Sequence, residues 1–188
     1  MAFGKNFSLP IETMYNHSGE YVLCAVLNDK RSDNEGLITP VQVFEESGKY
    51  KPNGSDPTVS YYCLPSAIVS EAQKKKMVVK LYNSDIPATN NDLIQNEERS
   101  LKETNVPFGK KSISAILSDS KNKYCLILLQ PGYWIAVKRK SNGRGFVIYD
   151  PKERMNKEFD SKDSVVKELK SSFTYGVTDN KTLVVAIE

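Results

Sequence analysis

Short apolar runs alternate with turn-forming residues in the C-terminal part of the chain. The runs 124–129, 133–138 and 145–149 are rich in β-branched and aromatic residues, and a polar stretch with Asn142-Gly143 separates the last two. Runs of this composition are typical of strands, and Asn-Gly favours the tight turn of a hairpin. The pattern therefore predicts an antiparallel β-meander over 124–149.

Other apolar runs predict strands outside this meander. Residues 21–27 form the first run and are expected to be a buried strand, and residues 38–45 alternate weakly between apolar and polar side chains. A further strand is expected over 77–82. Residues 182–187 are almost all apolar, which predicts a strand at the centre of the sheet.

Three segments have the features of helices. Residues 64–76 have a proline near their start and lysines at their end, and Thr89 is a candidate N-cap for a helix over 90–103. Residues 160–173 combine a polar start with apolar side chains at helical spacing. The expected fold is α+β, an antiparallel or mixed sheet with a C-terminal β-meander and two or three helices packed against it.

Length and composition predict one ordinary globular domain over residues 1–188. The chain is 39% apolar and 26% charged, and it is long enough to bury a core without disulfides or a metal. The N-terminus lacks the apolar stretch of a secretory signal, and no window is apolar enough to span a membrane. We therefore expect a cytoplasmic protein with no membrane partner, whose three cysteines are free thiols.

The net charge of +3 arises from 26 basic and 23 acidic residues that are mostly interspersed. Two basic clusters stand out, Lys74–Lys76 and a stretch that begins with Lys138 and Arg139. Runs of charge usually face solvent, but both clusters leave a nucleic-acid contact open.

No cofactor or metal motif is present in the sequence. The glycines do not form a phosphate-binding loop, and the single histidine, His17, has no second histidine with which to bind zinc. We therefore expect no cofactor and no metal site.

A cysteine nucleophile needs a base beside it, and His17 is the only imidazole in the chain. Cys24 and Cys125 lie in apolar runs, where cysteine behaves as a small hydrophobic residue. Cys63 precedes an expected helix, whose dipole would lower the pKa of its thiol. Cys63 is therefore the candidate nucleophile, although simple packing remains the alternative.

The C-terminal region resembles papain-like deubiquitinating cysteine proteases of the herpesvirus large-tegument type. The resemblance rests on the segments 126–140 and 145–151, the second of which ends in Asp150-Pro151, and on the helix and apolar strand that follow. It implies that Asp150 is the counterpart of the catalytic aspartate and Cys63 that of the nucleophile. The family's histidine is replaced by Lys152, which is protonated at neutral pH, so the resemblance implies an inactive protease.

These observations lead to two hypotheses. The first is a non-catalytic protein-binding module, such as a viral or mobile-element accessory factor that engages a host or structural protein. Its candidate binding residues are Tyr133, Trp134, Lys138, Arg139 and Lys152, because aromatic residues and arginine are enriched at binding hot spots. The alternative is a papain-like cysteine hydrolase, a peptidase or deubiquitinase, that uses Cys63, Asp150 and His17. The sequence leaves the oligomeric state open.

Overall fold

Helices dominate the first part of the chain and strands the second. The structure is a computed structural model that describes residues 18–30, 38–47, 64–89, 91–130, 133–153, 155–171 and 180–188. The helices are α1 (Ser18–Asp29), α2 (Pro40–Ser47), α3 (Pro65–Lys74), α4 (Asn91–Glu103), α5 (Ile113–Ser118) and α6 (Lys162–Ser171). The strands are β1 (Val79–Ser84), β2 (Ala88–Thr89), β3 (Phe108–Lys110), β4 (Tyr124–Gln130), β5 (Tyr133–Arg139), β6 (Phe146–Asp150), β7 (Met155–Phe159) and β8 (Asn180–Ile187).

The strands form a mixed sheet in the order β3-β1-β8-β4-β5-β6-β7, and the short β2 pairs with β8. Antiparallel pairing runs from β1 to β7, whereas β3 is parallel to β1. The predicted meander is confirmed as β4, β5 and β6, and β7 extends it. The predicted central strand is also confirmed, because β8 lies between β1 and β4. The α+β fold class follows from this arrangement.

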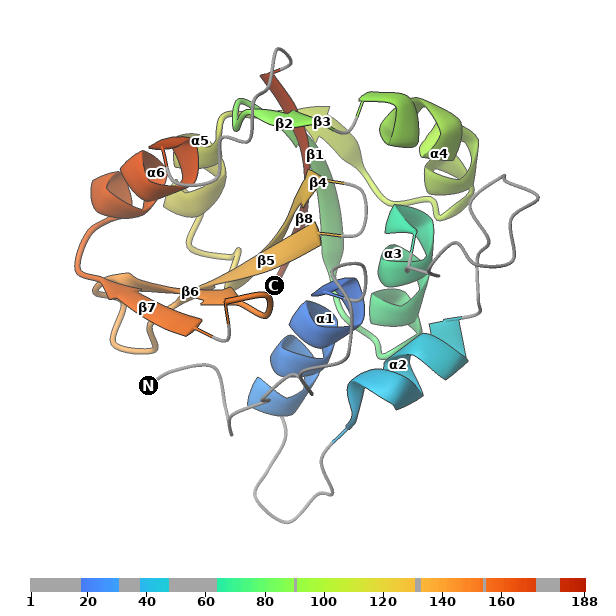
Figure 1. Cartoon of the computed structure of the whole chain (residues 1–188), viewed down its shortest axis with the longest axis horizontal. Coiled ribbons are helices and arrows are strands. Elements are labelled where there is room, and N and C mark those ends of the chain that lie inside the picture. Colours follow the sequence, from blue (N-terminus) through green and yellow to red (C-terminus); the bar gives the residue numbers. More distant parts are fainter. Residues whose placement is uncertain are drawn as a thin grey trace.

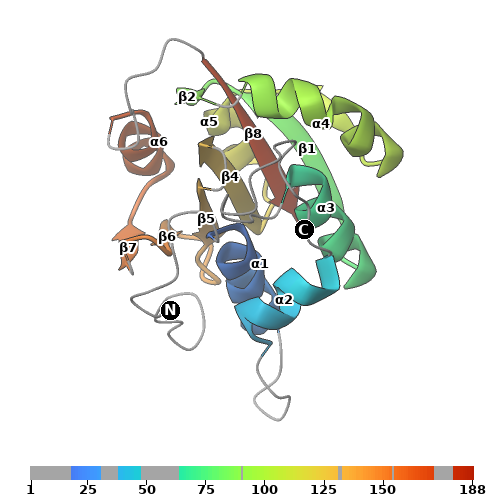
Figure 2. The same ribbon diagram turned by 45° about the vertical axis from the view of Figure 1, so that its right-hand side comes forward.

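Helices cover both faces of the sheet, as Figures 1 and 2 show. One core lies between the sheet and the helices α1 to α4, and a second core lies between the opposite face and α5 and α6. On β4, Leu126 and Leu128 belong to the first core, while Cys125 and Ile127 belong to the second. Because both of its faces are buried, β4 is apolar along most of its length. The described chain has six helices, more than the two or three expected.

The prediction of a strand over residues 21–27 is wrong, because this run is part of α1. Every residue from Ser18 to Asn28 is buried. A helix buried on all sides has no polar face, so its sequence lacks the 3.6-residue period that distinguishes a helix from a buried strand.

The weak alternation over residues 38–45 is also helical, in α2. Thr39 and Gln42 form a reciprocal capping box, in which each side chain accepts a hydrogen bond from the other residue's backbone N–H. Pro40 occupies the first helical position, where its missing N–H costs nothing. This start signal was present in the sequence and outweighs the alternation.

The remaining predicted helices and the strand over 77–82 are found as α3, α4, α6 and β1, with boundaries shifted by one or two residues. Thr89, the expected N-cap, belongs to β2, and α4 begins at Asn91. The sequence did not predict β3, α5 or β7, which are short and, in β3 and β7, contain charged residues.

The turn between β5 and β6 contains two glycines with positive φ, Gly143 at 72° and Gly145 at 89°. A Cβ at Gly145 would overlap the carbonyl oxygen of Phe159 and lie 3.2 Å from the Cα of Asp160, whereas a Cβ at Gly143 would meet no atom within 4 Å. We expect Gly145→Ala to lower the free energy of unfolding by about 3 kcal/mol. Gly143→Ala should cost about 1 kcal/mol, from backbone strain alone. Urea denaturation of both variants measures the difference, and equal losses would contradict the close contact with Phe159.

Candidate functional site

The start of α1 meets the start of β5. The backbone N–H of Trp134 donates a hydrogen bond to Oγ of Ser18, at 2.6 Å. The next residue of α1, Gly19, lies so close to the indole that a Cβ there would be 3.2 Å from Cδ1 and Nε1 of Trp134. Ser18 and Trp134 are both buried. The N-terminal end of α1 is therefore held against β5 by a hydrogen bond and by close packing.

Asp150, at the end of β6, is a buried carboxylate that accepts several hydrogen bonds. The hydroxyl of Tyr133 donates to Oδ2 at 2.7 Å, and the backbone N–H groups of Lys152 and Glu153 donate to Oδ1 at 3.0 and 3.3 Å. Asp150 is only 2% exposed and Tyr133 only 4%. The carboxylate thus joins the turn after β6 to the first residue of β5. We call Ser18, Tyr133, Trp134, Asp150 and Lys152 the corner cluster.

Burial raises the pKa of Asp150 above the usual value of an aspartate. The hydrogen bonds from Tyr133 and from the backbone N–H groups of Glu153 and Lys152 oppose this shift, and the negative charge of Glu153 adds to it. The net effect is a pKa above the ordinary aspartate value, because burial disfavours the charged form.

This raised pKa predicts a pH-dependent contribution to stability. Since the folded state binds the proton of Asp150 more tightly than the unfolded state, ionisation of Asp150 costs stability as pH rises. The loss begins near the ordinary aspartate pKa of about 3.9 and levels off above the raised pKa. Wild type should therefore lose stability relative to Asp150→Asn as pH increases through this window, as measured by urea denaturation at each pH. Asp163→Asn, at an exposed position, is the control, and parallel profiles for wild type and Asp150→Asn would contradict the prediction.

The corner cluster contains two of the group types found in hydrolytic sites but lacks the chemistry of such a site. A nucleophile is activated by a base that a third group orients. Ser18 supplies a hydroxyl and Asp150 a carboxylate, but the side chain that Asp150 holds is the phenol of Tyr133. A phenol has an ordinary pKa of about 10, so it is protonated at neutral pH. Within the described residues the cluster contains no imidazole that could accept a proton.

The two cysteines that the structure describes are buried and free of disulfides. Burial raises the pKa of each thiol to about 12, although a hydrogen bond from Asn28 partly opposes the shift at Cys24. Cys24 also donates to the carbonyl oxygen of Ile38 at 2.9 Å. Both thiols are therefore protonated at neutral pH and packed as small apolar groups. Cys63 and His17, the predicted nucleophile and base, lie outside the described residues.

Four of the five predicted binding residues are mainly engaged inside the molecule. Tyr133 and Trp134 are buried in the two cores. Lys138 pairs with Asp29 at 2.6 Å, and Arg139 donates to the carbonyl oxygens of Leu117 and Asp119 while lying over the ring of Phe146.

Lys152 differs from the other predicted binding residues because it is exposed. Its ammonium lies 5.0 Å from the ring centroid of Tyr133, within reach of a cation–π interaction. At the position where the resemblance places a catalytic histidine, the chain therefore has a surface lysine whose backbone, rather than side chain, contacts Asp150.

The basic clusters are also partly neutralised. Lys74 and Lys75 lie 3.3 and 3.6 Å from the fully buried carboxylate of Glu71, and Lys140 lies 2.8 Å from Glu158. These internal pairs reduce the charge that either cluster offers to a nucleic acid. In the part of the chain that the structure describes, no group of three or more metal-binding side chains occurs, and no helix has the length and apolar character needed to cross a membrane.

Sequence reasoning identified Asp150, Tyr133 and Trp134 separately but did not bring them together, and it missed Ser18. Ser18 was not identified because the apolar run 21–27 was interpreted as a strand, so no helix start was expected near it. The useful signal was a serine three residues before the start of a long apolar run, since serine is a preferred residue at helix starts.

Comparison with known proteins gives no relative for this chain: no protein-family model, no curated protein and no solved structure matches it.

Proposed function

We propose that this chain is a non-catalytic protein-binding domain that acts in the cytoplasm, as a viral or mobile-element accessory factor that engages a host or structural protein. The observation that carries the proposal is the buried pair of Asp150 and Tyr133. The carboxylate that would orient a catalytic base instead accepts a hydrogen bond from a phenol, and a phenol is a poor base at neutral pH. The contact between Asp150 and Tyr133 therefore stabilises the ends of β5 and β6 rather than orienting a catalytic base.

The thiols support the same proposal. Cys24 and Cys125 are protonated at neutral pH because burial raises the pKa of both, so neither is a nucleophile. Free thiols are also typical of a reducing compartment, which supports the cytoplasmic location.

The test is isolation of the full chain with its partner from cells that express it. The proposal predicts a complex of fixed stoichiometry that survives gel filtration and in which the partner remains intact by mass spectrometry. Truncation of the partner during incubation, or elution of the chain without any bound protein, would overturn the proposal.

The second candidate is a papain-like cysteine hydrolase that uses Cys63 as the nucleophile. It is favoured by one observation, the placement of Asp150 as a buried hydrogen-bond acceptor at the end of β6, beside the first residue of β5. A carboxylate in this position can orient a base. This candidate requires that His17 or another base reach Cys63, and loss of hydrolysis in Cys63→Ala would support it.

A further inference from the structure

Strand β3 forms one edge of the sheet. It pairs with β1 on one side, and among the described residues no strand pairs with its other side. All three of its residues, Phe108, Gly109 and Lys110, are exposed. An exposed edge of this kind offers backbone donors and acceptors to another extended chain.

The register shows which backbone groups of β3 point outward. Leu81 donates its N–H to the carbonyl oxygen of Pro107, and Lys111 donates to that of Asn83. In a parallel ladder the groups of alternate residues face the same neighbour, so Gly109 also faces β1. The N–H and C=O groups of Phe108 and Lys110 therefore point away from the sheet, in the spacing that an added strand requires.

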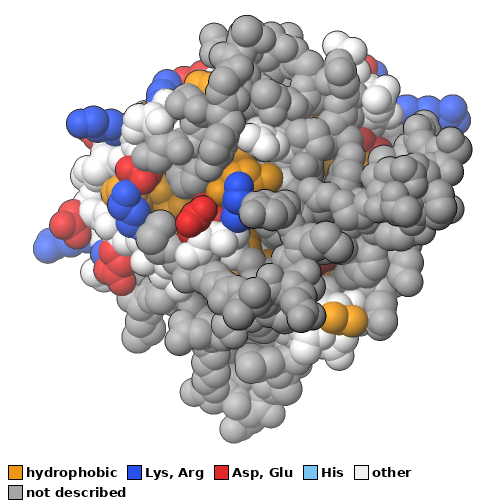
Figure 3. Space-filling view, in the orientation of Figure 1, with side chains coloured by type: hydrophobic (Ala, Val, Ile, Leu, Met, Phe, Trp, Pro, Cys, Tyr) orange, Lys and Arg blue, Asp and Glu red, His pale blue; other side chains and the backbone are white. Residues whose placement is uncertain are grey.

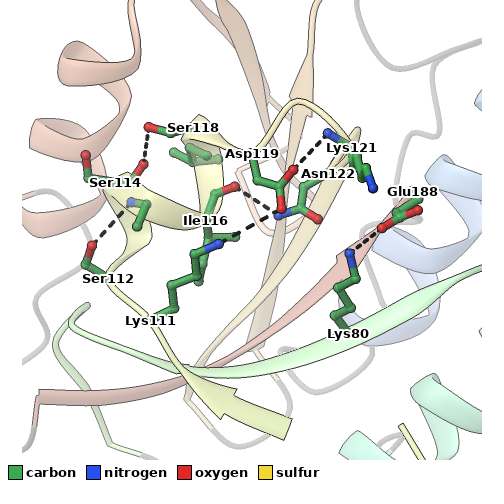
Figure 4. Close-up of polar contacts among 12 residues, drawn as sticks. Lys80, Lys111, Ser112, Ser114, Ile116, Ser118, Asp119, Lys121, Asn122 and Glu188 are labelled. Atoms are coloured by element: carbon green, nitrogen blue, oxygen red, sulfur yellow. Dashed lines mark hydrogen bonds and ion pairs between the residues drawn. The ribbon is translucent and has the colours of Figure 1, made fainter. Parts of the chain in front are cut away.

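The surface around this edge is basic. Figure 4 shows Lys111 directed toward Asp119, at 4.0 Å, and Lys80 toward Glu188, while the backbone N–H of Lys121 donates to Asp119. We call Lys80, Lys110 and Lys111 the basic edge. Among the described residues, the ammonium of Lys111 faces Asp119 and that of Lys80 faces Glu188, whereas Lys110 makes no ion pair.

Aromatic groups lie within the basic edge. Phe108 is 38% exposed, which makes it one of the few large apolar residues exposed at the described surface. The ammonium of Lys111 lies 5.6 Å from the ring centroid of Tyr82 on β1. The edge therefore combines positive charge with an exposed apolar side chain.

The opposite edge of the sheet, β7, has a different character. Lys157 pairs with Glu168 at 2.6 Å, and Glu158 pairs with Lys140 at 2.8 Å. Figure 3 shows basic and acidic side chains interspersed on the side of the molecule that carries α5 and α6. Balanced ion pairs at β7 contrast with the excess of positive charge at β3.

We propose that β3 is the docking site for an extended acidic segment of the partner protein, which adds to the sheet as a further strand. This inference rests on the proposed protein-binding function and specifies its binding mode. The outward backbone groups of Phe108 and Lys110 supply hydrogen bonds, and the basic edge selects acidic side chains on the added strand. A second copy of this chain would bring a second set of these lysines to the same edge, and like charges opposite each other are unfavourable.

The test is a titration of the full, ¹⁵N-labelled chain with a synthetic octapeptide of alternating glutamate and valine, followed by amide chemical shifts. We expect the shifts to change at residues 106–111 and along β1. An alternating lysine–valine octapeptide, and a glutamate–valine octapeptide N-methylated along one edge, should bind at least about tenfold more weakly, because they lack the charge or the backbone donors.

Variants of Lys110 test the charge by itself and the charge together with the backbone donor. Lys110→Glu should weaken binding of the glutamate–valine peptide by at least about fivefold. Lys110→Pro removes an outward N–H that bonds to no other strand, so it should preserve the fold and weaken binding about tenfold. Lys167→Glu, at an exposed position on α6, is the matched control and should bind as wild type. Circular dichroism melts verify that each variant is folded.

Equal binding of the lysine–valine peptide, unchanged binding by Lys110→Glu, or shifts confined to another surface would overturn the docking site. Tighter binding of a single-stranded oligonucleotide of the same charge, or dimers that form through β3 without peptide, would also overturn it. These outcomes leave the proposed function intact, because a partner could dock elsewhere. The proposed function fails separately, if the isolated partner is cleaved or no partner is bound.

Discussion

Replacing Trp134 with alanine is expected to lower the free energy of unfolding by about 3–5 kcal/mol. The indole has no exposed surface, and its packing against Gly19 at the start of α1 leaves the surrounding atoms little room to close a cavity. A loss of this size is a large part of the total stability of an ordinary domain, about 5–15 kcal/mol. Urea denaturation followed by circular dichroism measures it.

The control for Trp134 is an aromatic residue at the surface. Phe108→Ala should change the free energy of unfolding by less than about 1 kcal/mol, because Phe108 is 38% exposed. A small loss for Trp134→Ala would contradict its place in the core and would return Trp134 to the set of residues that a partner could contact.

The second large effect is expected at Lys138, which the sequence suggested as a binding residue. Its ammonium lies 2.6 Å from Oδ1 of Asp29, and the hydroxyl of Tyr124 donates to Oδ2 of the same carboxylate at 2.7 Å. The side chains of Lys138 and Asp29 are only 12% and 10% exposed. Lys138→Ala should therefore cost about 2–4 kcal/mol, because it leaves a nearly buried carboxylate without its counter-ion.

A pair at the surface provides the control for Lys138. Lys157→Ala breaks the ion pair with Glu168, in which the lysine is 47% exposed, and should cost about 0–1 kcal/mol. Combining Lys138→Ala with Asp29→Ala should recover part of the loss, since no charge is then left unpaired in that ion pair. If Lys138→Ala is as mild as Lys157→Ala, then Lys138 is available for binding rather than required for the fold.

The sequence predicted the meander well because local signals coincide there. The turn around Asn142-Gly143 separates two apolar runs, and Gly143 and Gly145 adopt the positive φ that such a turn requires. The central strand β8 was also predictable, because burial on both faces leaves a run that is almost all apolar.

The same rule failed for α1, because burial on all sides removes the period from a helix as well. The period of apolar residues then cannot distinguish a buried helix from a buried strand. The distinction depends on tertiary packing, here of α1 in one core with α2 and α3. The error at α2 had a different cause. The sequence contained a helix-start signal, the capping pair of Thr39 and Gln42, but the prediction relied on the weak alternation that follows it.

The corner cluster could be predicted only in part. Asp150 was identified through the resemblance to papain-like proteases, but its partner Tyr133 lies 17 residues earlier in the sequence. The contact between Ser18 and Trp134 spans 116 residues. Contacts of this length depend on strand register and on helix placement, which local patterns do not encode.

The most direct test of the non-catalytic claim is the reaction of the native chain with a thiol-reactive ubiquitin probe and, separately, with iodoacetamide across pH, followed by intact mass. The account predicts no ubiquitin adduct, no alkylation of Cys24 or Cys125 near neutral pH, and alkylation of Cys63 that rises at the ordinary thiol pKa of about 8.5. Rapid modification confined to Cys63, with a depressed apparent pKa and a ubiquitin adduct, would contradict the account and establish a cysteine hydrolase.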